Sequence, residues 1–541
     1  MVKVCPENRS PVILCAVKMP LTFIMSDHVK IIDLFAGPGG LGEGFSVYRD
    51  KKTGECPFSI AVSVEKEASA HKTLQLRSFF RKFSKENVPD EYYQYVRGEI
   101  TKKTLFDAYP EEAKAAYEET LHEPRALGVD DEYIYKQIRK SLREHDGPKV
   151  VIGGPPCQAY SLVGRARNMG KIGYDAKKDH RHFLYKEYLN ILNIVEPEVF
   201  VMENVKGILS STVDGELIFP KILNDLRCPG KAIGKSSKYS YRIFSFVKNA
   251  DNQAEPVYDD LSDFIIRSED YGVPQTRHRV ILLGVRNDIR FTPGLLERKK
   301  GLSIEKVIGE FPSLRSGLSK SLDSTLEWKK VVKEIIKNFP EHLRAEGLSE
   351  LASKIDRYPY KKVDAELRGG QAVYAPWSTV KSMSGELKDW YRDQRLKYIL
   401  NHETRGHIVD DLKRYYFCAS FAYVNSQREN PNPKSHEFPR FLAPKHKNWE
   451  TGKFSDRFRV QVAGKCATTI TSHISKDGHY FIHYDPLQCR SLTVREAARI
   501  QTFPDNYFFE GTRTQQYVQV GNAVPPLLAN KLAEIVYDLL R

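Results

Sequence analysis

Residues 29–42 read VKIIDLFAGPGGLG, an apolar run that leads into a glycine-rich loop. The first seven residues predict a buried strand, and a helix is expected to follow the loop. Gly37, Gly39 and Gly42 form the pattern G-x-G-x-x-G, which lets a ligand approach the backbone closely at a helix N-terminus. A phosphate-binding P-loop is excluded because no Lys-Ser/Thr pair follows.

The alternation of strands and helices continues along the chain. Leu184, Tyr188 and Ile191 fall at helical spacing, and Pro197 ends that helix. Strands that alternate with helices predict an α/β fold with a doubly wound, mostly parallel sheet. Further strands are expected at residues 58–64, 149–152, 199–202 and 280–285. The charged residues 101–146 interrupt the series and are interpreted as a solvated helical insertion.

Composition limits the class of protein. The 541 residues are 41% hydrophobic and 28% charged, which is ordinary for a globular chain, and the formal net charge is +14. Such a surplus favours a polyanionic partner, nucleic acid above all, although a merely basic protein would show it too. The eight cysteines include no C-x-x-C pair and fit no zinc pattern, so we expect no metal and a reducing compartment. No apolar run is long enough to span a membrane.

Four segments are expected. Residues 1–28 form an N-terminal extension that we expect to be dispensable, with Met25 as the working start. Residues 29–286 form a catalytic domain to which residues 466–541 return. Residues 287–465 lack the alternation and hold 34 Lys and Arg against 23 Asp and Glu, a surplus of 11 out of the total of 14. This second, smaller domain is expected to bind the phosphates of a nucleic acid. The alternative is a basic scaffold insert with no role in nucleic-acid binding.

Glu65 ends the second predicted strand, where an acid can accept hydrogen bonds from a ribose diol. Together with the glycine loop it suits a nicotinamide dinucleotide, a flavin or S-adenosylmethionine. These two features alone do not choose among the three cofactors.

Cys157 follows the apolar run 150–152 in the stretch Gly154-Pro155-Pro156-Cys157-Gln158. Two prolines stiffen the turn, and a thiol held rigidly at a strand end suits a nucleophile. An inert loop cysteine is the alternative. The glycine-rich loop upstream and the charged motifs downstream favour the nucleophile.

Three charged side chains accompany that thiol. Glu203 follows the strand 199–202, so it lies at the same edge of a parallel sheet as Cys157. A carboxyl group there can exchange a proton with a ring nitrogen. Arg277 and Arg279 alternate along a strand, so both guanidiniums are expected to face one site, with His278 turned away in a structural role. The alternative interpretations are that Glu203 is a solvent-exposed acid and that Arg277 and Arg279 are surface arginines.

These motifs together resemble the DNA (cytosine-5)-methyltransferases, of the prokaryotic restriction–modification type. The segment without a match, about 287–465, falls where that family keeps its variable target-recognition domain. The resemblance implies a class I S-adenosylmethionine-dependent methyltransferase fold. The matching motifs, in the family's order, are Asp33-Leu34-Phe35-Ala36-Gly37-x-Gly39, Pro155-Pro156-Cys157-Gln158, Glu203-Asn204-Val205, Gln275-x-Arg277-x-Arg279, Arg495-Glu496 through Phe503-Pro504, and Gln519-x-Gly521-Asn522-x-Val524.

The resemblance implies a mechanism. The target cytosine is rotated out of the duplex, and the Cys157 thiolate attacks its C6. Glu203 protonates N3, while Arg279, with Arg277 nearby, holds the O2 side. Carbon 5 then takes the methyl group of S-adenosylmethionine.

The cofactor site is also implied by the resemblance. Glu65 would hold the ribose and Glu99 the adenine amino group, although the family usually has Asp at the position of Glu99. The full set of implied cofactor-binding residues is Phe35, Ala36, Gly37, Gly39, Gly40, Glu65, Glu99, Ile100, Pro155, Asn522 and Val524.

Double-stranded DNA is the expected partner. A single protein sequence does not reveal which DNA sequence is recognised. We also expect a monomer in the bacterial cytosol or nucleoid, and a cognate restriction endonuclease that acts separately. The rivals are a transfer RNA cytosine-5 methyltransferase, whose recognition segment is usually short, a nicotinamide oxidoreductase, and a non-catalytic DNA-binding relative of the family.

Overall fold

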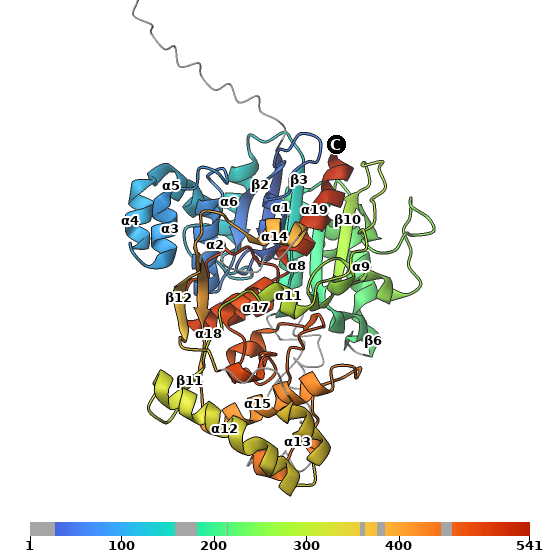
Figure 1. Cartoon of the computed structure of the whole chain (residues 1–541). Helices are drawn as coiled ribbons and strands as arrows, with labels where there is room; N and C mark the ends of the chain where they lie inside the picture. The colour runs from blue at the N-terminus through green and yellow to red at the C-terminus, as the bar shows by residue number, and fades with distance from the viewer. Residues whose placement is uncertain (1–27, 157–180, 214, 358–362, 376–384, 445–456) are drawn as a thin grey trace, which may run out of the picture.

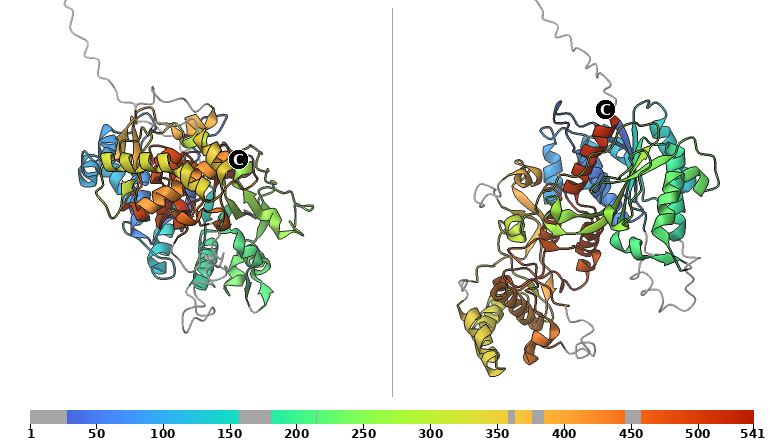
Figure 2. Two further views of the ribbon diagram at one scale, coloured as in Figure 1. Left: turned by 60° about the horizontal axis from the view of Figure 1, so that its bottom comes forward. Right: turned by 90° about the vertical axis from the view of Figure 1, so that its right-hand side faces the viewer.

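The computed structural model describes residues 28–156, 181–213, 215–357, 363–375, 385–444 and 457–541. A sheet covered by helices forms one part, and a smaller part holds α12, α13 and α15 (Figure 1). Figure 2 shows both parts from two further directions. Met25 lies outside the described residues. Within these ranges no helix combines the length and the apolar character needed to cross a membrane.

The central sheet confirms the predicted α/β class. Its strands run in the order β2-β1-β3-β4-β10-β7, with β8 paired to β10. Strands β1 to β4 are parallel, while β10 is antiparallel to β4. The order reverses direction between β1 and β3, and α/β folds bind ligands at the carboxyl ends of strands at such a point. The strands are β1 (Val29–Leu34), β2 (Phe58–Val64), β3 (Lys149–Gly153), β4 (Val199–Val205), β7 (Tyr241–Ser245), β8 (Ile265–Arg267) and β10 (His278–Arg286).

Helices cover both faces of this sheet, as a doubly wound fold requires. On one face α1 and α19 share a core with Ile31 of β1. On the other face α6, α8 and α9 share a core with Ile32 and Leu34. Because both faces are buried, the strands read as apolar runs. These helices are α1 (Gly40–Ser46), α6 (Asp131–Leu142), α8 (Arg181–Val195), α9 (Ile218–Arg227) and α19 (Pro526–Leu540).

Residues 101–146 are helical, as expected, but they are only partly solvated. Ile134 and Ile138 of α6 are fully buried in the core on β2, and Leu105 of α4 is buried in an outer cluster. The segment covers β2, an edge strand of the sheet, so tertiary packing buries helices whose charge suggested exposure. The outer helices are α2 (Ala68–Phe80), α3 (Asp90–Arg97), α4 (Lys102–Ala108) and α5 (Pro110–Glu119).

The smaller part has a hydrophobic core of its own around Trp328, Tyr415 and Phe417. That core continues past residue 465 to Cys489, while the boundary at 465 stays a prediction. Its main helices are α12 (Thr325–Ala345), α13 (Ser349–Asp356) and α15 (Val409–Val424). The antiparallel pair of β12 (Gly369–Tyr374) and β13 (Tyr398–Glu403) packs instead against α3 and α17. The remaining elements outside the 3-10 turns are α10 (Pro229–Ala232), α11 (Ile304–Ile308), α14 (Glu386–Tyr391), α17 (Val494–Ile500), α18 (Arg513–Asn522), β5 (Thr212–Val213), β6 (Glu216–Leu217), β9 (Gln275–Thr276), β11 (Gly317–Leu318), β14 (Gly406–His407) and β15 (Ala467–Thr468).

A buried ion-pair cluster joins α11, α14 and α17. Glu310, shortly after α11, forms ion pairs with Arg392, just after α14, and with Arg499 of α17. The Thr493 and Glu496 side chains form a capping box at the start of α17, because each accepts the other's backbone N–H. Breaking a buried ion pair leaves an uncompensated charge, so the Glu310 contacts resist separation of these helices.

Two buried imidazoles make the fold sensitive to acid. Burial lowers the pKa of His402 to about 3 and that of His483 to about 4. In the unfolded chain both groups titrate near 6.5, so the unfolded state binds more protons between about pH 6.5 and 4. Stability is therefore lost as the pH falls through this window.

We expect His402→Phe to reduce this sensitivity. The ring lies against Phe311, its Nε2 has no hydrogen-bond partner among the described residues, and its Nδ1 lies 2.9 Å from the Thr493 hydroxyl oxygen. A phenyl ring therefore keeps the ring packing and gives up one hydrogen bond. Between pH 7.5 and 5.5 the variant should lose about 1 kcal/mol less unfolding free energy than the parent. Urea unfolding at both pH values measures this, and equal losses in the two proteins would contradict the assignment.

Candidate active site

Glu203 and Arg279 face each other across neighbouring strands. In the β4–β10 register Glu203 pairs with Ile281, two residues from Arg279. Arg279 Nε lies 2.9 Å from Glu203 Oε1, and each side chain is only 15% exposed. Arg279 Nη1 also donates to the His278 carbonyl oxygen. The pair therefore sets a carboxylate and a guanidinium side by side at the ligand-binding edge of the sheet.

The Gly154-Pro155-Pro156 turn lies against this pair. A Cβ atom at Gly154 would lie 2.9 Å from Glu203 Oε2, so a larger residue would displace this carboxylate. Asn204 Nδ2 donates to the Pro155 carbonyl oxygen at 3.3 Å. Cys157, two residues after Pro155, lies outside the described residues. The part of the turn that leads to it is thus held beside Glu203.

The glycine loop and Glu65 meet at the ends of β1 and β2. Gly37 N–H donates to Glu65 Oε2 at 2.8 Å, and Glu67 N–H donates to Glu65 Oε1 at 2.6 Å. Each carboxylate oxygen keeps acceptor capacity for a ribose hydroxyl. Burial raises the pKa of Glu65, against the hydrogen bonds that lower it. Phe35, Gly37 and Gly39 all have positive φ, which turns the loop around this acid.

The C-terminal segment closes this crevice. A Cβ at Gly40 would lie 2.3 Å from the Val524 carbonyl oxygen, so the start of α1 touches the chain two residues after α18. Asn522 is the last residue of α18. The predicted edge of the sheet thus brings together the glycine loop, Glu65, Pro155, Asn522 and Val524.

Comparisons with known proteins agree on one family. The family model described as C-5 cytosine-specific DNA methylase matches residues 99–230 and 258–537. The chain belongs to this family. It is also 33% identical over 533 residues to the type II methyltransferase M.Bpa9945I of Bacillus paralicheniformis, covering 94% of this chain and 99% of that protein.

Other relatives are more distant. The chain is 26% identical over 429 residues to the DNA (cytosine-5-)-methyltransferase M.ApeKI of Aeropyrum pernix, over 72% of this chain and 81% of the relative. A solved structure of a methyltransferase encoded within an E. coli prophage is similar with a TM-score of 0.47 and 17% identity, over 95% of this chain and 99% of that one.

Family membership gives the reaction. This methyltransferase transfers a methyl group from S-adenosylmethionine to carbon 5 of cytosine in DNA, and its sheet belongs to the class I fold. Neither the nicotinamide oxidoreductase nor the transfer RNA alternative is better supported. The crevice at Glu65 fits the donor's ribose, because a buried acid with spare acceptor sites faces it.

The expectation that Arg277 and Arg279 face one site stays a prediction, and Arg277 contacts the C-terminal segment. Its buried guanidinium donates to the carbonyl oxygens of Ile470 at 2.8 Å and Gly521 at 3.3 Å. Strand β9 ends at Thr276 and β10 begins at His278, so Arg277 lies between two strands and regular alternation fails there. Arg277 joins the C-terminal segment to the site. His278 faces Glu269 at 2.7 Å, in the structural role expected.

Glu99 and Ile100 do not lie at a strand end. Gly98 caps α3 with φ of +81°, and Glu99 forms an exposed ion pair with Arg97 at 2.6 Å. A Cβ at Gly98 would lie 3.3 Å from Gln371 of β12, which places this turn beside the β12–β13 pair. The expectation that Glu99 and Ile100 bind the adenine stays a prediction, and both residues lie in the turn between α3 and α4.

A concave surface beside the site carries hydroxyl groups and a cation. It encloses about 490 Å³ and is lined by Thr276, Arg459, Thr468, Thr469, Thr471, His473, Tyr480 and Phe481. Thr276 and Thr468 are register partners of β9 and β15, so the surface begins one residue from Arg277. Hydroxyl, imidazole and guanidinium groups are suited to phosphate oxygens. No sequence pattern distinguished these threonines from the other threonines of the chain.

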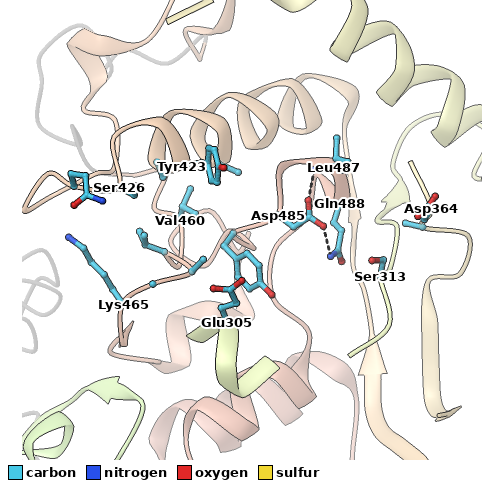
Figure 3. A pocket seen from close by; sticks show the side chains of 18 residues that line it. Glu305, Ser313, Asp364, Tyr423, Ser426, Val460, Lys465, Asp485, Leu487 and Gln488 are labelled. Carbon is cyan, nitrogen blue, oxygen red and sulfur yellow. Dashed lines mark hydrogen bonds between the residues drawn. The ribbon is translucent and has the colours of Figure 1, made fainter. Parts of the chain in front are cut away.

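A cavity of about 680 Å³ lies between α15 and residues 460–465 and 484–488 (Figure 3). Glu305, Asp364 and Asp485 line it together with Lys465, and Asp485 hydrogen-bonds the Gln488 side chain. Its lining includes neither Glu203 nor Arg279, and its acidic surplus does not suit a nucleic acid. Among the described residues no group of three His, Cys, Asp or Glu side chains is placed to hold a metal ion.

Sequence reasoning missed three contributors to the site. Gly154 and Asn204 hold the proline turn, and only the spatial contact with Glu203 and Pro155 reveals this. Asp33 lies in a recognised motif, but its burial was not expected. Its carboxyl oxygens have no hydrogen-bond partner among the described residues, and burial raises its pKa to about 8.

Proposed function

We propose that Cys157, Glu203 and Arg279 perform the addition chemistry on a flipped-out cytosine. The observation that carries this is the Glu203–Arg279 pair next to the Gly154–Pro156 turn, which leads directly to the thiol. Covalent addition at C6 is needed because C5 of an aromatic pyrimidine is a poor nucleophile.

The steps balance in protons and electron pairs. The Cys157 thiolate forms a bond to C6 while Glu203, protonated for this step, donates its proton to N3. Arg279 then keeps its cation beside the resulting carboxylate and can hydrogen-bond O2 of the base. S-adenosylmethionine supplies the electrophilic methyl group that C5 takes up. Loss of the C5 proton to a base, expulsion of the thiolate and return of the N3 proton to Glu203 restore the ring.

For cofactor binding we propose Phe35, Ala36, Gly37, Gly39, Gly40, Glu65, Pro155, Asn522 and Val524. The hydrogen bonds that Gly37 and Glu67 give Glu65 fix the orientation of its carboxylate for two ribose hydroxyls. Gly40 allows Val524 to close the crevice. Titrating S-adenosylhomocysteine into Glu65→Gln by calorimetry tests the set: binding should weaken about tenfold or more, and an unchanged affinity would overturn it.

Specific binding to duplex DNA is proposed for residues 287–465 and the threonine-lined surface. Supporting this are the concentrated basic charge and the position of Thr276 in this surface, three residues before Arg279 in the chain. We further propose a monomer that acts in the bacterial cytosol independently of any cognate restriction endonuclease. The name type II methyltransferase of the relative from Bacillus paralicheniformis supports the restriction setting, and sedimentation measures the oligomeric state.

DNA affinity should fall steeply with salt, because phosphate contacts release counterions. Arg459→Ala should reduce the slope of log K against log salt by about one. Lys103→Ala, on the exposed surface of α4, is the matched control and should leave the slope unchanged. Fluorescence anisotropy from 50 to 300 mM salt, roughly the range in which such slopes are resolved, measures both. A flat dependence in the parent protein would rule out this DNA-binding surface.

A further inference from the structure

A pocket of about 590 Å³ lies beside the edge strand β2, where the ends of α1 and α2 approach α14. Its lining includes none of Glu65, Glu203 and Arg279, and it shares no residue with the threonine-lined surface. The pocket is therefore separate from the proposed cofactor site and from the catalytic pair. Its volume lies within the range of pockets that hold small molecules.

Part of the pocket lining is aromatic. Trp390 of α14 is held in one orientation, because its indole N–H donates to the Thr502 carbonyl oxygen at 2.7 Å. Aromatic rings offer a large apolar contact area to a flat ligand. The five aromatic residues of the lining are Phe58, Phe80, Phe83, Trp390 and Tyr391.

Basic residues outnumber acidic residues in the same lining. Six basic residues accompany three acidic residues, which is a surplus of three. Glu310 pairs with Arg392 from outside the pocket and reduces this surplus to two. A cleft with a surplus of one sign of charge concentrates ligands of the opposite sign. The basic residues are Arg49, Arg77, Arg81, Lys82, Lys85 and Arg392, and the acidic residues are Glu43, Glu119 and Asp389.

Part of this positive charge is buried. Glu43 accepts two hydrogen bonds from the Arg77 guanidinium, and Arg81 Nη1 lies 3.6 Å from Glu43 Oε2. Glu119 accepts hydrogen bonds from Arg81 at 2.7 Å and from Lys82 at 2.6 Å. The Arg81 side chain is only 10% exposed, and its Nη1 has no hydrogen-bond acceptor among the described residues. Two carboxylates thus serve three cations in this cluster.

The carboxyl group of Asp33 does not neutralise the cluster at pH 7. Burial raises the pKa of Asp33 to about 8, although the nearby Arg81 cation lowers it. The group is therefore mostly protonated and uncharged at neutral pH. A buried cation without a counter-charge is unfavourable, so an anion taken from solution would stabilise the cluster.

We propose that this pocket binds a small organic anion that has a flat apolar body and one carboxylate or phosphate group. The body lies along the aromatic lining, and the anionic group lies toward Arg81 and Lys82. Guanidinium groups suit both kinds of anion, because they donate paired hydrogen bonds to two oxygens. Lys85 is exposed at the pocket, has no ion pair among the described residues and adds a further cation.

Binding of 1-naphthyl phosphate to the full-length protein tests the proposal by calorimetry, with S-adenosylhomocysteine present at saturation to fill the cofactor site. The dissociation constant should be about 0.1 mM. It should be at least about tenfold lower than those of 1-naphthol and of inorganic phosphate, because each of these has only one of the two features. Comparison with 1-naphthoate identifies the preferred anionic group. Binding of both naphthyl anions no tighter than that of 1-naphthol would overturn the proposal.

Cys56 reports whether the anion occupies this pocket. Cys56 is a half-buried free thiol in the pocket lining, whereas Cys228 is a half-buried free thiol outside it. Saturating 1-naphthyl phosphate should slow alkylation of Cys56 by at least about threefold and leave Cys228 unchanged, since access controls the rate. Peptide mass analysis measures both rates. A bound anion that leaves the alkylation of Cys56 unchanged would lie elsewhere and would overturn the assignment.

Two substitutions test the cations. Arg81→Gln keeps a donor for Glu119 but removes the charge, and it should weaken binding of 1-naphthyl phosphate about tenfold. Lys85→Ala changes an exposed side chain, so it leaves the fold intact and should weaken binding about threefold. Lys103→Ala, on the exposed surface of α4, is the matched control and should leave the affinity unchanged. Thermal unfolding without ligand checks the fold of each variant. Unchanged affinity in Lys85→Ala and in folded Arg81→Gln would contradict the proposal.

Discussion

Serine in place of Cys157 should abolish methyl transfer and leave DNA binding largely intact. A hydroxyl at neutral pH is a far weaker nucleophile than a thiolate, so addition to C6 should slow by at least about 10³-fold. Single-turnover transfer of a labelled methyl group measures the chemistry, and anisotropy measures DNA affinity.

Cys228→Ser is the matched control for this substitution. Cys228 is a half-buried free thiol at the C-terminal end of α9, and its loss should leave turnover unchanged. Retained turnover in Cys157→Ser would exclude covalent catalysis through Cys157.

Glutamine in place of Glu203 should lower the rate of methyl transfer by about 10² to 10⁴-fold. The amide cannot transfer a proton to N3, so negative charge accumulates on the ring during addition. It also leaves Arg279 without its 2.9 Å carboxylate partner. The measurement is single-turnover methyl transfer at saturating S-adenosylmethionine and DNA.

The control for Glu203 lies just before the same strand. Glu198 precedes β4 and pairs with Arg286 at 2.7 Å, at the opposite end of the strand from Glu203. Glu198→Gln should preserve the rate even if it lowers stability. A Glu203→Gln rate within about threefold of the parent rate would remove this residue from the proton-transfer step.

Local pattern predicted the sheet well, because strands buried on both faces must be continuously apolar. Val29–Leu34 and Val199–Val205 are such runs, and both are central strands. The capping box at Thr493 and Glu496 is equally local, since both partners lie within one helical turn.

Features set by tertiary contacts could not be predicted in this way. Charge suggested that residues 101–146 are exposed, but Ile134 and Ile138 are buried because they cover an edge strand. No pattern in the sequence showed that Glu99 pairs with Arg97 in the turn between α3 and α4. The contacts of Arg277 with Ile470 and Gly521 were equally unpredicted, because they join residues far apart in the sequence.

The Glu203–Arg279 pair could be predicted from the sequence only in part. Glu203 and Arg279 were recognised from motifs, but their contact depends on the antiparallel register of β4 and β10. Gly154 is required only because that contact brings Glu203 Oε2 against the proline turn. Sequence thus identified the reacting groups, and the fold supplied the geometry that connects them.

Covalent trapping on a duplex that carries 5-fluorocytosine at the target position tests the central claim most directly. Fluorine at C5 blocks the final elimination, so the bond between the thiol and C6 should persist. The account predicts an enzyme–DNA adduct that survives denaturation, needs S-adenosylmethionine and maps by peptide mass to Cys157. Absence of any adduct under turnover conditions, or an equally abundant adduct in Cys157→Ser, would contradict it.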